Sequence, residues 1–249
     1  LNDPSSVNTS VHVISGANDN VKDWRLRVSL APNSTIFYKS SNPGIMQPLR
    51  NTSGAIFPYT PQVTVSHTAR YAEAKLTHSN YASYFYEGSE VSAIQISGDF
   101  TVQTVEEGKY LLAVISFFRS CTKMFFGNQD TSKLAGSPPP LLFLNGYGHY
   151  YFPNVTCVLT SFQHTMPAEV DYIEVSTSKN QSQYNRGIQT GQSVISSADL
   201  YAAAPTRVPT SSQISITLQP VYSRKRVHEQ FNLEQFANGS LLSGTGAFI

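Results

Sequence analysis

The chain has 249 residues, of which 40% are hydrophobic and only 13% are charged, and its formal net charge is +1. A chain of this length can bury a real core, as one large β domain or as two smaller ones. The near-neutral charge gives no support for broad electrostatic binding of nucleic acid, although it stays compatible with a locally charged channel. A low charged share is typical of β-rich proteins whose surfaces are covered by partners, and a neutral polar surface is the simpler alternative.

Two cysteines, Cys121 and Cys157, are too few for a disulfide scaffold and lack a close metal-ligand spacing. We therefore predict two buried free thiols. The sequence shows no signal-like opening, no apolar run of membrane-spanning length and no amphipathic basic helix. These features predict a soluble protein that is made in a cytoplasm and has no membrane anchor.

The first predicted strand covers residues 21–31, where apolar and polar residues alternate. Its apolar face carries Trp24, Leu26, Val28 and Leu30. Residues 36–38 predict a second, short strand. Residues 40–54 hold Asn-Pro-Gly, a second proline and a closing Ser-Gly, so we predict a long exposed loop. Loops of this length in compact domains usually bind something, which makes this one a candidate contact element.

Residues 61–76 and 90–104 predict two further strands with the same alternation. One side of the later strand carries Ile94, Ile96, Gly98, Phe100 and Val102. Gly98 inside a strand indicates a bulge or close packing. Residues 81–86 are rich in aromatic side chains but have no interleaved basic residues, so we interpret them as core or interface packing rather than as a stacking surface for bases or sugars.

Residues 106–126 predict the one long helix, because apolar residues recur there with a helical period. Glu106 and Glu107 in the first turn suit the helix dipole, and we expect Gly127 to end the helix. The apolar face carries Leu111, Val114, Ile115, Phe118, Cys121, Thr122 and Phe125. Phe117, Met124 and Phe126 widen this surface, which predicts either a second neighbour such as another subunit or a deeply buried helix.

Residues 141–145 and 150–166 predict a hairpin that turns around Gly146 and Gly148. On its second strand we expect one continuous face carrying Val158, Thr160, Phe162, His164 and Met166.

Short strands are predicted at residues 170–175 and 213–218, where Ile214, Ile216 and Leu218 would face together. Between them, residues 176–210 are dominated by Ser, Gln, Asn and Thr, and we interpret them as a polar insertion loop.

The last segment carries a short basic run at residues 223–226, which reads equally well as a binding site for an acidic patch or phosphate and as a solvated tail. Residues 233–237 predict a short helix, capped by Asn232 and ended by Gly239. We divide the chain into a β domain, 1–220, and a C-terminal extension, 221–249.

Strands separated by turns, with one helix between two strand groups, predict a mainly β fold. We expect an antiparallel β-sandwich or β-barrel flanked by one α-helix at about residues 106–126.

Catalytic and cofactor motifs are missing from the sequence: it has no Gly-rich nucleotide loop, no His-Glu-x-x-His and no Gly-x-Ser-x-Gly. Its six histidines are scattered, and its acid pairs, such as Glu106 with Glu107, are explained by helix capping and loop solvation. We predict no catalytic residue, no metal site and no cofactor, and therefore no enzyme.

Several long runs together resemble tail tube proteins of contractile-tailed bacteriophages (myoviruses), most closely the baseplate-proximal tube proteins that include the tail tube initiator. The runs are PYTPQVTVSHTARY at 58–71, SEVSAIQISGDFTVQT at 89–104, KYLLAVISFFRSCTKMFFG at 109–127, PPPLLFLNGYG at 138–148, VLTSFQHTMPAEVDYI at 158–173 and PVYSRKRVHEQFNLEQFANGSLLSG at 220–244. The resemblance covers most of the chain from about residue 55 onward, except the polar insertion.

This resemblance implies a virion protein of the viral tail, with six copies in a ring whose inner strands join into one continuous barrel. The implied partners are further copies of the chain, adjacent tube rings, the baseplate hub, the sheath and the tape-measure protein, with viral DNA passing transiently through the lumen. Long loops and the C-terminal extension would reach these neighbours. The candidate interface residues are Arg224, Lys225, Arg226, Phe231, Phe236, Phe117 and Phe126.

Two alternatives stay open. Within the same family, the chain resembles the main tube protein of the tail shaft, although the basic C-terminal extension favours the baseplate version. From another class, a virion β-sandwich that binds or degrades carbohydrate would use Trp24 and the tyrosines as stacking platforms. The sequence offers neither a convincing acid pair nor a Trp-rich face for that role.

Overall fold

The computed structural model describes residues 23–127, 134–175, 206–242 and 247–249. Over these residues the protein is mainly β, with antiparallel strand pairs and a few helices, which confirms the predicted class. Its largest sheet is open and has seven strands. In spatial order these are β2 (Ala55–Ile56), β1 (Arg27–Leu30), β7 (Leu142–Gly146), β8 (Phe152–Thr165), β11 (Ser211–Pro220), β6 (Ile94–Thr101) and β3 (Gln62–Thr64). The described residues form no closed barrel.

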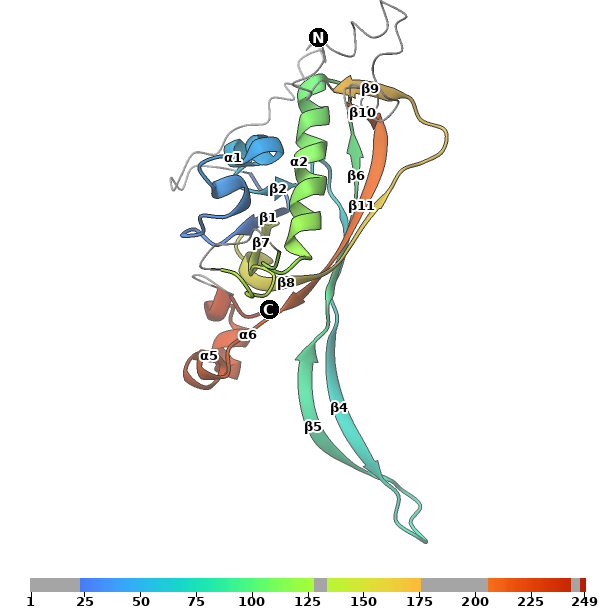
Figure 1. The fold of residues 1–249 in the computed structure, drawn as a ribbon. Coiled ribbons are helices and arrows are strands. Elements are labelled where there is room, and N and C mark those ends of the chain that lie inside the picture. Colours follow the sequence, from blue (N-terminus) through green and yellow to red (C-terminus); the bar gives the residue numbers. More distant parts are fainter. Residues whose placement is uncertain (1–22, 128–133, 176–205, 243–246) are drawn as a thin grey trace, which may run out of the picture.

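Two antiparallel strand pairs lie outside the main sheet (Figure 1). They are β4 (His67–Ala74) with β5 (Ser83–Val91), and β9 (Tyr172–Val175) with β10 (Thr206–Pro209). The described helices are η1 (Phe37–Lys39), η2 (Gly44–Met46), α1 (Gln47–Thr52), α2 (Val105–Cys121), α5 (Arg224–Gln230), α6 (Leu233–Ala237) and η3 (Ser240–Leu242). Helix α2 is the long one, and it packs along one face of the main sheet (Figure 1).

The central strands β6, β11 and β8 have an apolar face and a polar face. Ile216 of β11 lies opposite Ile96 of β6 and Phe162 of β8, and the ring of Phe162 stacks on Phe118 of α2 with centroids 5.7 Å apart. The next row, Ser215 with its strand neighbours, points away from the helix. The alternation predicted for β6 and β11 is therefore confirmed, and it directs their isoleucines into the core.

The single continuous face predicted for β8 is wrong. Val155, Cys157 and Leu159 point into the core in the first half of the strand, whereas Phe162 is the inward residue beyond them. The pairing with β11 slips between Thr217 and Leu218, which are opposite Ser161 and Leu159. This bulge adds one residue to β8 and exchanges the faces, because side chains alternate with a period of two.

Helix α2 starts with a capping box, in which Thr104 accepts a hydrogen bond from the backbone of Glu107 and the Glu107 carboxylate accepts one from the backbone of Thr104. It ends at Cys121, earlier than the predicted boundary near residue 126. The apolar pattern continues to Phe125, but this residue exchanges backbone hydrogen bonds with Gly136 and Ser137 instead of continuing the helix.

The predicted exposed loop at 40–54 is also wrong, because η2 and α1 occupy residues 44–52. Leu49 and Thr52 are buried, and this short helical segment packs against α2, with α1 also in contact with β2. The short strand predicted at 36–38 is the 3-10 helix η1 instead. The first strand is shorter than predicted, and Trp24, expected on its buried face, is mostly exposed.

The two strands predicted at 61–76 and 90–104 each break into two. β3 and β6 belong to the main sheet, whereas β4 and β5 continue beyond it as a separate hairpin. A hydrogen bond from the backbone of Ser92 to Ser66 joins the two parts. The hairpin projects far out of the body, and we refer to residues 67–91 as the arm (Figure 1).

Close packing, one of the two predictions for Gly98, is confirmed, because β6 pairs with β11 without a shift at this residue. A Cβ atom at this position would lie 2.6 Å from the ring of Phe57 and 3.0 Å from Pro61. Gly98 thus lets the segment before β3 cross closely over the sheet.

Several other predictions are confirmed. The hairpin of β7 and β8, strand β9 and strand β11 form where they were expected. Helix α6 is capped by the Asn232 side chain. Helix α5, capped by Ser223, was not predicted. Most of the predicted polar insertion, residues 176–205, lies outside the described residues, and its last residues form strand β10.

Candidate assembly interface

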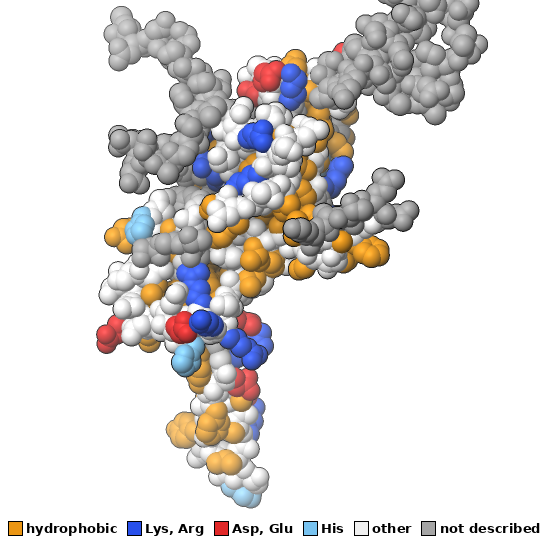
Figure 2. Space-filling view, turned by 60° about the vertical axis from the view of Figure 1, so that its left-hand side comes forward, with side chains coloured by type: hydrophobic (Ala, Val, Ile, Leu, Met, Phe, Trp, Pro, Cys, Tyr) orange, Lys and Arg blue, Asp and Glu red, His pale blue; other side chains and the backbone are white. Residues whose placement is uncertain are grey.

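The arm is the most unusual surface of the molecule, since both of its faces are open to solvent. Its strands pair with each other, and no residue of the arm belongs to the hydrophobic core. Six large apolar side chains are nevertheless exposed on it: Tyr71, Leu76, Tyr81, Tyr84, Phe85 and Tyr86. Figure 2 shows hydrophobic side chains along the arm, at the lower end of the molecule. An isolated two-stranded hairpin is only marginally stable in water, so the arm is a candidate contact surface.

The register of the arm puts apolar groups on both faces. Tyr71 lies opposite Tyr86, with ring centroids 5.7 Å apart, and Tyr84 follows on the same face. Phe85 lies on the other face, opposite Ala72. The sequence interpretation of residues 81–86 allowed core or interface packing, and within this chain the structure excludes the core.

The predicted basic run lies on helix α5, and its three residues differ in their contacts. Arg224 and Lys225 are exposed, and Lys225 lies 4.0 Å from Glu229 one turn later. Arg226 is half-buried, donates a hydrogen bond to Gln230 and places its guanidinium 5.2 Å from the ring centre of Phe248. Arg226 therefore supports the local fold, whereas Arg224 and Lys225 present their charge to solvent.

An aromatic cluster holds the C-terminal helices together. Phe248 is buried, stacks on Tyr222 at 4.9 Å and meets Phe231 edge-on at 5.6 Å. Phe231 and Phe236, both predicted interface residues, are 5.8 Å apart and remain partly exposed. Phe248 was not singled out from the sequence, because no local pattern marks a residue that packs on a helix some 20 positions earlier.

A groove of about 290 Å³ lies where this cluster meets the root of the arm. Its lining is mostly apolar and consists of Val65, His67, Tyr150, Tyr151, Phe152, Phe236, Leu242, Phe248 and Ile249. Tyr150 and Tyr151 come from the turn between β7 and β8 and are exposed. We refer to this feature as the C-terminal groove.

The two predicted interface residues of the long helix have opposite environments. Phe117 is fully buried, with its ring against Phe37, Tyr38 and Phe118. The prediction that Phe117 contacts another subunit is therefore wrong, because η1 and α1 of the same chain cover that flank of the helix. Phe126 lies beyond the helix end and is 82% exposed, so it remains available to a partner.

A second hollow, of about 220 Å³, lies beside Trp24. Trp24 and Tyr147 stack there with ring centroids 6.2 Å apart, and Tyr59 and Arg25 also line it. Its lining within the described residues contains no carboxylate. The hollow offers stacking to a flat ligand but no acid pair for hydrolysis.

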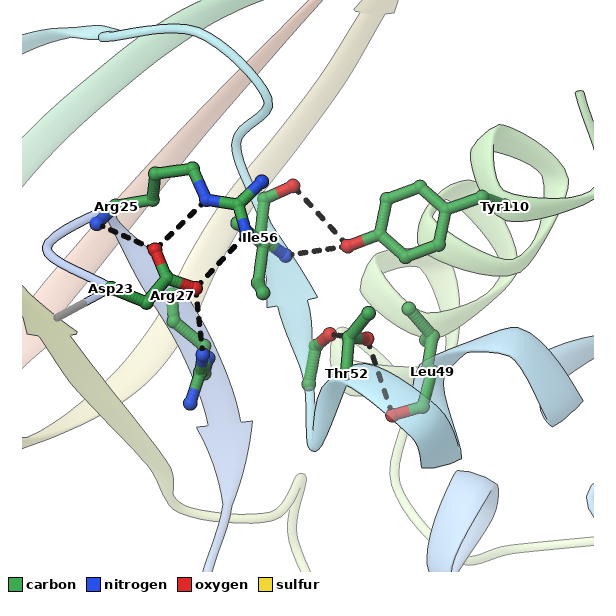
Figure 3. Close-up of polar contacts among 8 residues, drawn as sticks. Asp23, Arg25, Arg27, Leu49, Thr52, Ile56 and Tyr110 are labelled. Carbon is green, nitrogen blue, oxygen red and sulfur yellow. Dashed lines mark hydrogen bonds and ion pairs between the residues drawn. The ribbon is translucent and has the colours of Figure 1, made fainter. Parts of the chain in front are cut away.

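A polar network fixes the start of β1 (Figure 3), and one of its residues, Arg25, also lines this hollow. The Asp23 carboxylate accepts hydrogen bonds from Arg25 at 2.8 and 3.0 Å and from Arg27 at 3.3 Å. The hydroxyl of Tyr110 on α2 accepts a hydrogen bond from the Ile56 amide at 2.7 Å and thereby ties β2 to the helix. These hydrogen bonds pair the Asp23 carboxylate and the Tyr110 hydroxyl, whereas the buried Nε of Arg27 has no partner among the described residues. The paired groups indicate a structural network.

The Asp23 network makes the free energy of unfolding depend on pH in the acid range. Burial raises the pKa of Asp23, but hydrogen bonds from Arg25 and the charges of Arg25 and Arg27 outweigh it, so the net pKa lies below the ordinary 3.8. The stabilisation is therefore present above about pH 4 and is lost as pH falls through the lowered folded-state pKa. We expect Asp23→Asn to lower the free energy of unfolding at pH 7 by about 1 kcal/mol, in denaturant titrations.

The difference between Asp23→Asn and the unmodified chain should shrink in titrations below pH 4. Glu106→Gln is the matched control, since the Glu106 carboxylate pairs with Lys109 but is 80% exposed, and we expect little change at either pH. An Asp23→Asn chain that is as stable as the unmodified one at pH 7 would contradict the assigned role.

Cys121 and Cys157 are free and buried, as predicted. Burial raises the pKa of the Cys121 thiol far above its usual range and that of Cys157 to about 12, so neither is a ready nucleophile at neutral pH. In the described part of the chain, no group of three or more His, Cys, Asp and Glu side chains is placed to hold a metal ion. None of the described helices is long and apolar enough to cross a membrane.

No protein-family model matches the chain. A search of the curated proteins likewise finds no match.

Proposed function

We propose that this protein is a structural component of a contractile phage tail. Six copies form a ring of the tail tube at the baseplate end, template polymerisation of the tube and surround part of the channel through which viral DNA is ejected. The ring works through its surfaces, because a folded ring presents strands and loops that order the next ring. The assignment to this family rests on the sequence resemblance described above.

The observation that carries the self-assembly part of this proposal is the arm. A two-stranded hairpin with aromatic residues on both faces needs a partner, and it extends far from the body of its own chain (Figure 1). In a ring or a stack of rings, neighbouring copies supply that cover. The low overall charge of the chain is consistent with a surface that is mostly in contact with other proteins.

The open sheet supports a barrel that closes only between copies. β3 pairs with β6 from Gln95 to Ser97, and among the described residues no strand continues this pairing beside Gly98–Thr101. An unpaired edge of this kind invites a strand from another copy. The tail-tube type of β-barrel is thus our proposal for the assembled state.

The polar face of the central strands suits the wall of a DNA channel. Ser97, Ser215 and Gln163 form one row across β6, β11 and β8, and Gln95, Thr217 and Ser161 form the next. Asp99 adds a charge on this face, where it accepts a hydrogen bond from Gln213 at 3.3 Å. Without arginine or lysine in these rows, the face holds phosphate groups weakly and favours sliding.

Native mass spectrometry and negative-stain imaging of the purified chain test the proposal, both alone and after addition of a baseplate hub or main tube protein. We expect sixfold rings, or stacks that form only when a partner supplies the first face. A stable monomer that never stacks under any of these conditions would contradict the proposed function.

The main tube protein of the tail shaft is the nearest alternative. The exposed basic residues and helices of the C-terminal extension favour the baseplate version, because they offer contacts beyond the sheet. Long tubes that grow from the purified chain alone would favour the shaft protein.

A carbohydrate-binding virion domain is the more distant alternative, and the hollow at Trp24 and Tyr147 is the observation that favours it. That function predicts glycan binding that is lost in Trp24→Ala and a chain that does not form rings.

A further inference from the structure

We propose that the tip of the arm of one copy docks into the C-terminal groove of a second copy. This inference rests on the self-assembly proposed above and names the two surfaces that meet. The contact is heterologous, because a different surface of each copy takes part.

The arm tip supplies an apolar projection with no cover of its own. Leu76 and Tyr81 flank the turn between β4 and β5, and Tyr81 is 86% exposed, more than any other large apolar residue described. Tyr84 and Phe85 follow on opposite faces of β5. A tip of this composition gains free energy from any apolar surface that removes it from water.

The groove supplies the complementary hollow. Tyr150, Tyr151 and Phe236 line it. Phe248, which belongs to the aromatic cluster, lines it as well. Tyr150 is 76% exposed. The groove lining contains no Asp, Glu, Lys or Arg among the described residues, so an uncharged tip enters it without leaving a charge unpaired.

The geometry of one chain prevents its own tip from filling its own groove. Val65 and His67, at the root of the arm, line the groove, whereas Tyr81 is at the opposite end. The eight residues of β4 span about 26 Å at roughly 3.3 Å per residue, and the paired strands cannot fold back on themselves. A tip that fills a groove must therefore come from another copy.

The tip supplies about half of the area of a standard interface. Its aromatic side chains Tyr81, Tyr84 and Phe85 are 61–86% exposed. At about 150–250 Å² for each aromatic residue, they offer on the order of 400 Å². A standard interface buries about 800 Å² on each partner, so the proposed contact includes further residues of the arm.

Charge substitutions at exposed tyrosines test this contact with little effect on folding. We expect Tyr81→Asp on the arm and Tyr150→Asp in the groove each to weaken assembly at least tenfold, measured by analytical ultracentrifugation where the unmodified chain assembles. Tyr172→Asp on β9 is the matched control, because Tyr172 is 66% exposed and lies outside the proposed contact. It should assemble normally.

Mixing the two variants distinguishes docking of an arm in a groove from pairing of two arms. The Tyr81→Asp chain keeps an intact groove and the Tyr150→Asp chain keeps an intact arm, so a 1:1 mixture should restore the contact between unlike chains and sediment as larger species than either variant alone. Assembly of Tyr150→Asp equal to that of the unmodified chain would overturn the groove as the docking site, including the case in which two arms pair with each other. An unmodified chain that never assembles would overturn the proposed function as well.

Disulfide cross-linking gives a second, direct readout. A chain with Tyr81→Cys and Tyr150→Cys should form covalent dimers and longer products under mild oxidation. The two native thiols are buried and do not compete. The pair Tyr81→Cys with Tyr172→Cys should give none, and equal cross-linking of both pairs would overturn the docking.

Discussion

A chain without the arm is expected to fold but not to assemble. Residues 68–90 can be replaced by Asn-Gly, since His67 and Val91 are paired and a two-residue turn of this type joins antiparallel strands. The aromatic residues on both faces leave with the arm, whereas the core loses no member. We expect monomers in native mass spectra and a free energy of unfolding within about 1 kcal/mol of that of the full chain.

The control for the armless chain keeps the apolar surface and removes only hydroxyl groups. Tyr71→Phe, Tyr84→Phe and Tyr86→Phe together preserve the rings, at the cost of the hydrogen bond between Tyr86 and Ser89. This chain should still assemble. Rings formed equally well by the armless chain would show that the arm is not an assembly element.

Phe117→Ala is expected to cause the largest loss of stability of any single substitution considered. Phe117 is fully buried against the rings of Phe37, Tyr38 and Phe118, and its truncation leaves a cavity between α2 and the helical segment that covers it. Substitutions of this kind cost about 3–5 kcal/mol. Because a domain is stable by only about 5–15 kcal/mol, the variant should unfold at much lower denaturant concentration.

Phe126→Ala is the matched control, because it makes the same chemical change at a residue that is 82% exposed. We expect its free energy of unfolding to change by less than about 0.5 kcal/mol. Equal losses for the two variants in urea titrations would contradict the assignment of Phe117 to the core.

The candidate assembly surface was only partly predictable. The aromatic stretch at 81–86 and the basic run on α5 stand out in the sequence; the aromatic residues of the stretch are exposed in the structure, as are Arg224 and Lys225 of the run. The C-terminal groove could not be predicted, since it combines the arm root, the turn before β8 and Phe248, which are far apart along the chain. Phe117 was predicted as an interface residue but belongs to the core. A wide apolar face on a helix has the same sequence pattern whether the same chain or another chain packs against it.

Local patterns by themselves determined the elements whose signals are complete within a few residues. The alternation of β6 and β11, the helical period of α2 and the Asn232 cap of α6 each predict their structure directly. These signals depend on backbone geometry, in which side chains repeat every 2.0 or 3.6 residues.

Only the tertiary structure decided where a continuously alternating stretch passes from one strand pair to another. Residues 61–76 alternate throughout, yet β3 joins the main sheet and β4 leaves it. The face of β8 changes at Thr160 because β11, far away in sequence, pairs with it out of step. Alternation records which side chains share a face, but the burial of that face depends on which distant segment packs against it, and this is a property of the folded chain.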